Sequence, residues 1–386
     1  MKRAEQIRLL EDLMEKVASG TNVNSGVTLK NPSKSYWCPE LAAREWQTFF
    51  RNHPQIIGMS GDLPEPGSFF TLDDFGAPVL ATRDLGGEFH AFVNSCRHRG
   101  AMVETREKGQ CQRFTCPFHG WTYANSGELT AVTMTEQFGP LDKSDYGLLR
   151  LPAVEKYGFL WVHPNPHGSI VADDLLGGLA SEFESWKFGE LVYGGRSTYA
   201  MPLNWKLAND TFGESYHFKR LHKDSLAAVF EGDVQCFDRF ERNLRMALAY
   251  RSIDQLSNRR QENWRITDGA FLVYYLYPNI QVNVGVTGVT LVRIYPDPKD
   301  PTNSISHISF YIRKELLLQD PETVKRRAQA FGDIVESEDY AVGVTAQKAI
   351  QSGMQEHLLF GHNEPGLQHF HNTFRDALGM APLESI

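Results

Sequence analysis

Two cysteine–histidine pairs constrain this chain more than any other feature of its sequence. Cys96 and His98 stand in "CRH", and Cys116 and His119 stand in "CPFH", with 17 residues between the two pairs. Thiolates and imidazoles are common ligands of zinc and iron in proteins. Each pair lies where a strand-like run gives way to a loop, so we expect the two loops to converge on one metal site.

Two thiolates and two imidazoles can hold either a tetrahedral zinc ion or a [2Fe–2S] cluster with cysteines on one iron and histidines on the other. Zinc fingers usually place both cysteines first, whereas here the order of ligands alternates. The second pair is followed by the indole of Trp121, which can cover a cluster, and by Tyr123, whose phenol can donate to sulfur. Such surroundings tune a redox potential. They favour the cluster, and a zinc-stabilised binding protein without catalytic activity is the remote alternative.

Composition excludes several other classes of protein. The 386 residues are 41% hydrophobic and 22% charged, which is typical of a globular chain of about two domains. A net charge of −8 without a long basic run argues against nucleic acid as a partner. Neither a signal-peptide core nor a membrane-spanning apolar segment is visible, so we expect a cytoplasmic protein. Five cysteines in such a chain indicate metal or redox use of a subset, and not a disulfide framework.

Strand and helix signals divide the chain into three segments. Residues 1–36 read as a helix and a lead-in that packs on the C-terminal domain. Residues 37–163 are β-rich, with a turn signal at Ser126-Gly127. Residues 164–386 contain a block of strands and a long helix over about 321–351. The expected fold class is therefore α+β.

A second group of candidate metal ligands lies in "NDTFGESYHFKRLH". A helix that begins near Asn204 would place Asp210, Glu214 and His217 on one stripe. His222 follows His217 by five residues, about 140° further round a regular helix, so both imidazoles face one metal only if the last turn loosens. Taken alone, the simpler interpretation is two surface histidines on an acidic helix.

Together, the two groups resemble the Rieske non-haem iron oxygenases, and specifically the large subunit that binds dioxygen and substrate. The resemblance covers nearly the whole chain, from C-x-H and C-x-x-H to "ESYHFKRLH". It implies a Rieske domain at 37–163 and a catalytic domain at 164–386 with a helix-grip fold, an antiparallel sheet curled around a long helix. It implies a [2Fe–2S] cluster bound by Cys96, His98, Cys116 and His119, and a mononuclear Fe(II) bound by His217 and His222.

The resemblance also implies a carboxylate ligand on the long C-terminal helix. The family pattern places an aspartate eight residues before a glutamine, and Asp339 and Gln347 match it, with Glu336 and Glu338 as reserves. Two histidines and one carboxylate on one face of iron leave positions open for dioxygen.

Glu214 stands where the family usually has an aspartate that links the mononuclear site to a Rieske histidine of the neighbouring subunit. The resemblance therefore implies a role for Glu214 in electron and proton transfer, and a head-to-tail ring, expected to be a homotrimer. A separate small β subunit is the alternative. A glutamate at this position is similar to the members that act on quaternary amines.

The expected function is that of a terminal oxygenase component. Because the chain has no flavin or dinucleotide fingerprint, electrons from NAD(P)H should arrive through a separate reductase, with or without a ferredoxin. Cations between Arg97 and Arg113 would suit an acidic electron donor. The expected substrate is a small aromatic compound, carboxylated or not, which is hydroxylated or dihydroxylated. The alternative is a quaternary amine or methoxy compound that is hydroxylated or demethylated.

Two further patterns bear on the pocket and its surroundings. Gln281 and Asn283 alternate with valines, which predicts a strand with one polar face. That face is a candidate lining of a cavity, with Val273 and Tyr275 as further candidates, and a place in the core or on the surface is the equal alternative for all four residues. The C-terminal region carries four histidines whose spacing fits no known metal site. We expect them to line a subunit contact or to pack near the entrance of the catalytic domain: His357, His362, His369 and His371.

Overall fold

A computed structural model describes residues 1–386, apart from the side chain of Arg327. The chain forms two compact units. The larger unit comprises Met1–Trp46, Asp173–Trp186 and Tyr193–Ile386, and the smaller comprises Gln47–Ala172 and Lys187–Val192. Helices and antiparallel sheets together confirm the predicted α+β class. Among the described residues, no helix has the length and apolar character needed to cross a bilayer.

The smaller unit is built from short antiparallel strands. One sheet has the order β10-β5-β4-β3-β6, a second β7-β8-β9, and a third β11-β12-β2. The predicted turn at Ser126-Gly127 joins β8 to β9. The strands are β2 (Gln55–Met59), β3 (Ser68–Leu72), β4 (Val79–Arg83), β5 (Phe89–Val93), β6 (Lys108–Gln110), β7 (Arg113–Thr115), β8 (Thr122–Ala124), β9 (Leu129–Ala131), β10 (Arg150–Leu151), β11 (Ala153–Lys156) and β12 (Phe159–Val162).

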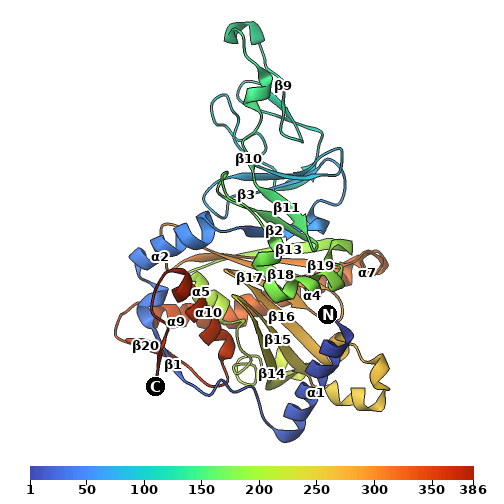
Figure 1. The fold of residues 1–386 in the computed structure, drawn as a ribbon, viewed down its shortest axis with the longest axis vertical. Coiled ribbons are helices and arrows are strands. Elements are labelled where there is room, and N and C mark those ends of the chain that lie inside the picture. Colours follow the sequence, from blue (N-terminus) through green and yellow to red (C-terminus); the bar gives the residue numbers. More distant parts are fainter. The chain divides into compact units, whose positions relative to one another are not determined.

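The core of the larger unit is a seven-stranded antiparallel sheet with the order β13-β19-β18-β17-β16-β15-β14, whose central strands lie side by side in Figure 1. Almost every residue of its central strands is buried, as expected for a sheet covered on both faces. Its strands are β13 (Leu191–Met201), β14 (Phe230–Phe240), β15 (Asn243–Tyr250), β16 (Ala270–Leu276), β17 (Ile280–Val284), β18 (Val289–Pro296) and β19 (Ser304–Arg313).

A long helical segment packs beside β19. It consists of α8 (Pro321–Ile334), a π-helical turn η11 (Val335–Tyr340) and α9 (Ala341–Ile350), which confirms the predicted helix over 321–351. The side chain of Asp320 caps its start by accepting from the Thr323 amide at 3.0 Å. A π-helical turn is rare and often marks a functional site.

The helix predicted from Asn204 onward is much shorter than expected. It begins as predicted, because Asn204 Oδ1 accepts from the Lys206 amide at 2.9 Å, but α5 ends at Asp210 (Trp205–Asp210). The Glu214 carboxylate accepts from the backbone amides of Tyr216 and His217, and so replaces the helical hydrogen bonds there. The predicted helical stripe through Asp210, Glu214 and His217 was therefore wrong.

The remaining elements surround this core, and Figure 1 shows α1 alongside β14. They are α1 (Arg3–Ser19), β1 (Leu29–Pro32), α2 (Pro39–Glu45), α3 (Ala172–Leu176), α4 (Ala180–Trp186), α6 (Ile266–Gly269), α7 (Lys314–Gln319), β20 (His357–Phe360), α10 (Pro365–Ala377) and β21 (Glu384–Ser385).

Candidate metal centres and active site

The two cysteine–histidine pairs lie in loops with the same backbone hydrogen bonds. The Cys96 amide donates to the Ala101 carbonyl, and the Cys116 amide donates to the Trp121 carbonyl, both at 2.8 Å. In each loop a glycine amide donates back to the cysteine carbonyl, from Gly100 at 2.9 Å and from Gly120 at 3.0 Å. Both glycines have a positive φ, 78° and 72°, which other residues rarely adopt.

These matched loops bring the four side chains of the first site together. Cys96 and Cys116 are buried, and the rings of His98 and His119 lie 4.7 Å apart between centroids. The Nδ1 atoms of both histidines are buried without a hydrogen-bond partner. An orphaned buried nitrogen is costly unless its lone pair is used. Two thiols and two such nitrogens fit a [2Fe–2S] cluster with one sulfur pair and one imidazole pair.

The residues expected to surround the cluster are in place. The ring of Trp121 stacks on that of His98, with centroids 5.1 Å apart and planes inclined by 11°. The Tyr123 hydroxyl lies 3.3 Å from Cys96 Sγ and accepts from the Arg97 amide at 3.0 Å. Burial, and then the contact with Cys96, raises the pKa of Tyr123, so the phenol keeps its proton. Beside a cysteine that binds iron as a thiolate, this protonated phenol would be the donor of the contact with sulfur.

The cations near these loops are only partly available to an acidic electron donor. Arg106 pairs with Glu104 at 2.6 Å, and Lys108 pairs with Asp62 at 2.8 Å. Arg99 lies over the exposed ring of Phe118. Docking of an acidic partner on this surface stays a prediction.

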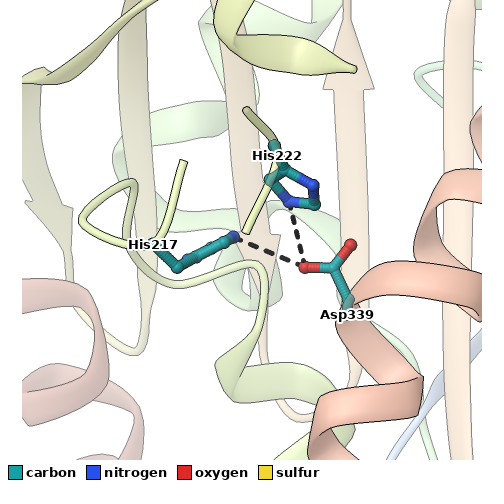
Figure 2. A group of neighbouring side chains, drawn as sticks. All are labelled: His217, His222 and Asp339. Carbon is teal, nitrogen blue, oxygen red and sulfur yellow. Dashed lines mark ion pairs between the residues drawn. The ribbon is translucent and has the colours of Figure 1, made fainter. Parts of the chain in front are cut away.

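The second site lies in the larger unit. Figure 2 shows His217 and His222 pointing at Asp339, which comes from η11. Asp339 Oδ1 lies 3.4 Å from His217 Nε2 and 3.3 Å from His222 Nε2. Candidate ligand atoms of the three residues lie within 4.8 Å of one another. Two imidazole nitrogens and one carboxylate oxygen in this arrangement fit a non-haem Fe(II) with open positions.

A glutamate holds each of these histidines through its other nitrogen. His217 Nδ1 pairs with Glu214, and His222 Nδ1 lies 2.8 Å from Oε2 of Glu338. Ser225 Oγ donates to the same Glu338 oxygen at 2.9 Å. With Nδ1 held by a carboxylate, Nε2 of each ring is the nitrogen that lies toward Asp339 and is left to bind a metal.

The reserve carboxylates therefore lie outside the ligand set in this geometry. Glu338 contacts the outer nitrogen of His222 and not the side that faces Asp339. Glu336 is exposed, as is Asp333. Only the family's spacing to Gln347 singled out Asp339 among these acids, because which of them faces the histidines depends on the π-helical turn.

The carboxylates of this site favour positive charge on the two histidines, and they would likewise favour a bound metal cation. Burial opposes a charge on His217, but Asp339 and Glu214 raise its pKa to about 10. Burial also opposes a charge on His222, and Asp339 and Glu338 raise its pKa as well. Burial would raise the pKa of Asp339, yet the two imidazoles lower it. A divalent cation would bind here by displacing protons from the histidines, so its affinity depends on pH.

A cavity of about 300 Å³ opens beside these three residues. Four aromatic rings form part of its wall. Phe230 is at their centre, with ring centroids 5.6 Å from Phe218, 5.3 Å from Tyr250 and 5.7 Å from Phe271. Phe218 also lies 5.2 Å from the ring of His222, so the aromatic wall begins at the candidate ligands. Among the described side chains, no lysine or arginine lines this cavity.

The predicted polar strand contributes one of its two amides to the cavity. Asn283 and Val273 line it, and Asn283 Oδ1 is buried without a hydrogen-bond partner. Gln281 instead donates to Asn209 Oδ1 at 2.8 Å, and the Tyr275 hydroxyl donates to the Pro278 carbonyl at 2.7 Å. Neither lines this cavity, so those two expectations were wrong.

A buried network that the sequence did not reveal lies on another side of the same residues. A second cavity of about 250 Å³ is lined by Glu214, His217 and Asp339, and also by Tyr36 and Asp210. The Tyr36 hydroxyl donates to Asp210 Oδ2 at 2.7 Å, and Nε2 of His371 lies 3.0 Å from both Asp210 oxygens. His371 is 161 residues from Asp210, and no sequence spacing signals that contact.

Both units match known protein families. Residues 53–154 match the Rieske [2Fe-2S] domain, and residues 188–380 match the family described as ring hydroxylating alpha subunit (catalytic domain). The chain belongs to the Rieske oxygenase alpha subunits. As a member of this family it is a non-haem iron oxygenase that carries a Rieske cluster and a mononuclear iron, and it receives electrons from a separate reductase.

Curated relatives of this Rieske oxygenase include monooxygenases and dioxygenases. The choline monooxygenase of Spinacia oleracea is 26% identical over 90% of this chain and 78% of the relative. The carnitine monooxygenase oxygenase subunit of Escherichia coli K12 is 24% identical over 88% of this chain and 91% of the relative. The anthranilate 1,2-dioxygenase large subunit of Acinetobacter baylyi is 32% identical, over 50% of this chain and 42% of the relative.

Solved structures share the fold of this Rieske oxygenase. The quaternary ammonium Rieske monooxygenase CntA, in complex with L-carnitine, has a TM-score of 0.77 at 20% identity, covering 92% of this chain and 96% of the other. Naphthalene 1,2-dioxygenase from Rhodococcus sp., bound to indole, has a TM-score of 0.71 at 18% identity, covering 96% and 98%. The likeness confirms the predicted combination of a Rieske domain with the family's catalytic fold.

Proposed function

We propose that this terminal oxygenase acts on a small quaternary ammonium compound, which it hydroxylates or demethylates next to nitrogen. The observation that carries the proposal is the aromatic wall of the 300 Å³ cavity, which is formed by rings packed around Phe230. No described lysine or arginine lines this cavity. The faces of aromatic rings attract quaternary ammonium groups. The relatives named for choline and carnitine support this substrate over the aromatic one that the sequence analysis placed first.

A neutral aromatic substrate is the second candidate. The same rings would stack on it, and the anthranilate dioxygenase relative favours it. A benzoate-like acid fits less well, because no described lysine or arginine lines the cavity to pair with its carboxylate. An unpaired buried carboxylate is strongly disfavoured.

The proposal assigns the two metal groups to the two sites described. The mononuclear iron supplies dioxygen activation when bound. The chain's own residues hold the metals, orient the imidazoles and keep water from the aromatic wall. The proposed ligands are Cys96, His98, Cys116 and His119 for the [2Fe–2S] cluster, and His217, His222 and Asp339 for iron.

A matched pair of variants tests this assignment. Cys116→Ala should remove the visible absorption of the cluster and leave one iron bound. Asp339→Ala should retain the absorption and lose the mononuclear iron, measured by metal analysis. If either variant is as stable as the unmodified protein but loses both the cluster and the mononuclear iron, the assignment of two separate metal sites is wrong.

We also propose that Glu214 links the iron site to a Rieske histidine of a neighbouring subunit in a head-to-tail homotrimer. Supporting this, Glu214 lies at the wall shared by both cavities, and large side chains nearby are exposed, with Tyr216 at 65% and Leu359 at 56%. Such side chains often mark interfaces. The mass of the purified protein in solution tests the trimer, and a monomeric active enzyme would contradict it.

The substrate is tested by oxygen consumption with a reductase and NADH. The panel should pair trimethylammonium compounds with neutral aromatics and aromatic acids, and the products should be identified. We expect coupled turnover only with the ammonium compounds. Product formed from naphthalene or benzoate, and none from any ammonium compound, would overturn the proposal.

A further inference from the structure

We infer that the cavity selects a short quaternary ammonium alcohol, whose hydroxyl group is bound by the carboxamide of Asn283, and that it rejects ammonium compounds with a carboxylate. This inference rests on the proposed function and narrows its substrate class. It comes from three features of the cavity: an unpartnered amide, its place beside the aromatic wall, and the sign of the charges around it.

The amide of Asn283 lacks the partner that a buried polar group normally has. The residue is 2% exposed and lines the cavity, and its Oδ1 is buried without a hydrogen-bond partner among the described residues. Asn279 and Gln281 also have a side-chain oxygen without a partner, but their amide nitrogens donate to the Ile294 carbonyl and to Asn209, both at 2.8 Å. Neither of these two residues lines the cavity, whereas Asn283 does. Because leaving a buried amide unpaired is unfavourable, a ligand atom is its natural partner.

A hydroxyl is the group that suits this amide best. A carboxamide offers an accepting oxygen and a donating nitrogen, and a hydroxyl can both donate and accept. It therefore pairs with Asn283 whichever end of the amide faces the cavity. An apolar tail would leave the amide unpaired.

The amide lies close to the aromatic wall along the strand. Gly285 follows Asn283 by two residues, and a Cβ on Gly285 would meet Phe271 Cδ2 at 3.3 Å and the Tyr250 hydroxyl at 3.8 Å. Two residues of an extended strand span about 7 Å. A cation against these rings and a hydroxyl on Asn283 would thus be joined by a chain of only a few atoms.

The charges around the cavity oppose a carboxylate in the same place. Its ionisable wall residues other than histidine and tyrosine are Glu214 and Asp339, and no described lysine or arginine joins them. A substrate carboxylate at Asn283 would lose its hydration without gaining a lysine or arginine as its partner. A hydroxyl is uncharged, so moving it from water into the cavity costs much less desolvation free energy.

The experiment measures binding of three probes to the reduced, metal-loaded holoenzyme by calorimetry without oxygen. The probes are choline, ethyltrimethylammonium, which lacks the hydroxyl, and glycine betaine, which carries a carboxylate. We expect choline to bind about 10- to 100-fold more tightly than ethyltrimethylammonium, the range for one unpaired buried polar group. Glycine betaine should bind more weakly than either.

Two substitutions of Asn283 test whether this residue causes the preference for choline. Asn283→Leu keeps the volume of the side chain and removes its polar atoms. The affinity for choline should therefore fall to that for ethyltrimethylammonium, and the affinity for ethyltrimethylammonium should not change. Asn283→Asp keeps an acceptor and should retain the preference for choline. The visible spectrum of the cluster and the Tm report whether each variant folds. If Asn283→Leu does not fold, the ratio of the affinities for choline and ethyltrimethylammonium in the unmodified enzyme still tests the inference.

The outcomes separate this inference from the proposed function. Equal binding of choline and ethyltrimethylammonium would overturn the inference and leave the proposed function standing. The inference is overturned in the same way if Tyr250→Phe, and not Asn283→Leu, removes the preference. Binding of indole or naphthalene, with no binding of any ammonium probe, would overturn both.

Discussion

His222 Nδ1 lies 2.8 Å from Oε2 of Glu338, while Nε2 of the same ring lies 3.3 Å from Oδ1 of Asp339. Two consecutive residues of the π-helical turn therefore contact both nitrogens of one imidazole. The π-helical turn thus supplies both a candidate ligand and the residue that orients another ligand.

Glu338→Gln should weaken iron binding without disturbing the fold. An amide cannot hold the imidazole proton as a carboxylate does, and loss of such a partner typically costs 10- to 100-fold in metal affinity. Titration of the metal-depleted protein with Co(II), followed by its visible spectrum, measures this directly. The control is Glu336→Gln, which lies in the same π-helical turn and is exposed. Equal affinities in the two variants would contradict an orienting role for Glu338.

Tyr123→Phe should make the cluster harder to reduce. The variant removes the hydroxyl 3.3 Å from Cys96 Sγ, and a hydrogen bond to sulfur stabilises the reduced state. Loss of ~1.4 kcal/mol corresponds to about 60 mV for one electron, so the potential should fall by about that amount. A redox titration followed by absorbance measures it. Tyr146→Phe, whose ring packs edge-on against Trp121, should leave the potential unchanged.

Lys206→Met should destabilise the larger unit severely. Lys206 Nζ lies 2.6 Å from Glu45 Oε2, and both side chains are at most 3% exposed. The same carboxylate accepts from the Trp205 indole at 3.1 Å. Removing one partner of a buried pair costs about 3–5 kcal/mol because the other charge is left unpaired. Urea unfolding measures the free energy, and Lys206→Met combined with Glu45→Gln should recover part of the loss.

A matched control for that variant is Arg260→Met. Arg260 pairs with Glu262 at 3.5 Å, but the two side chains are 84% and 70% exposed. Surface pairs contribute little, so its unfolding curve should overlay that of the unmodified protein. A Lys206→Met protein as stable as this control would show that the buried pair contributes nothing net.

Stability should fall as the pH drops below 6.5, in part because of His369. Burial lowers the pKa of this histidine to about 4 in the folded chain, against about 6.5 when unfolded. Between these values only the unfolded state takes up the proton, so the free energy of unfolding decreases by about 3 kcal/mol as the pH falls from 6.5 to 4. His369→Leu should flatten this slope, measured by Tm against pH. His362→Leu, at an exposed position, should not.

The candidate metal-binding loops were predictable because they are local. Cys96 with His98 and Cys116 with His119 are each set by one tight loop, so spacing alone carries the geometry. Asp339 was chosen from the family's spacing to Gln347, on a helix whose extent the sequence predicted well. That it faces His217 and His222 depends on the whole sheet, and only the resemblance to a family supplied that information.

What the sequence could not show depends on competition between side chains and backbone, or on distant contacts. The helix from Asn204 stops at Asp210 because the Glu214 carboxylate takes up two amides that a helix would use. Alternation along β17 predicted which face is polar, but not that Asn283 alone reaches the cavity while Gln281 pairs with Asn209. Such outcomes require the packed neighbours to be known.

The two imidazoles that face Asp339 differ in what anchors them. Ser225 fixes the glutamate behind His222, so that ring is tied to the interior of the unit. The glutamate behind His217 instead belongs to the walls of both cavities. The glutamate behind His222 lines neither cavity, so of the two glutamates only Glu214 can contact what occupies them.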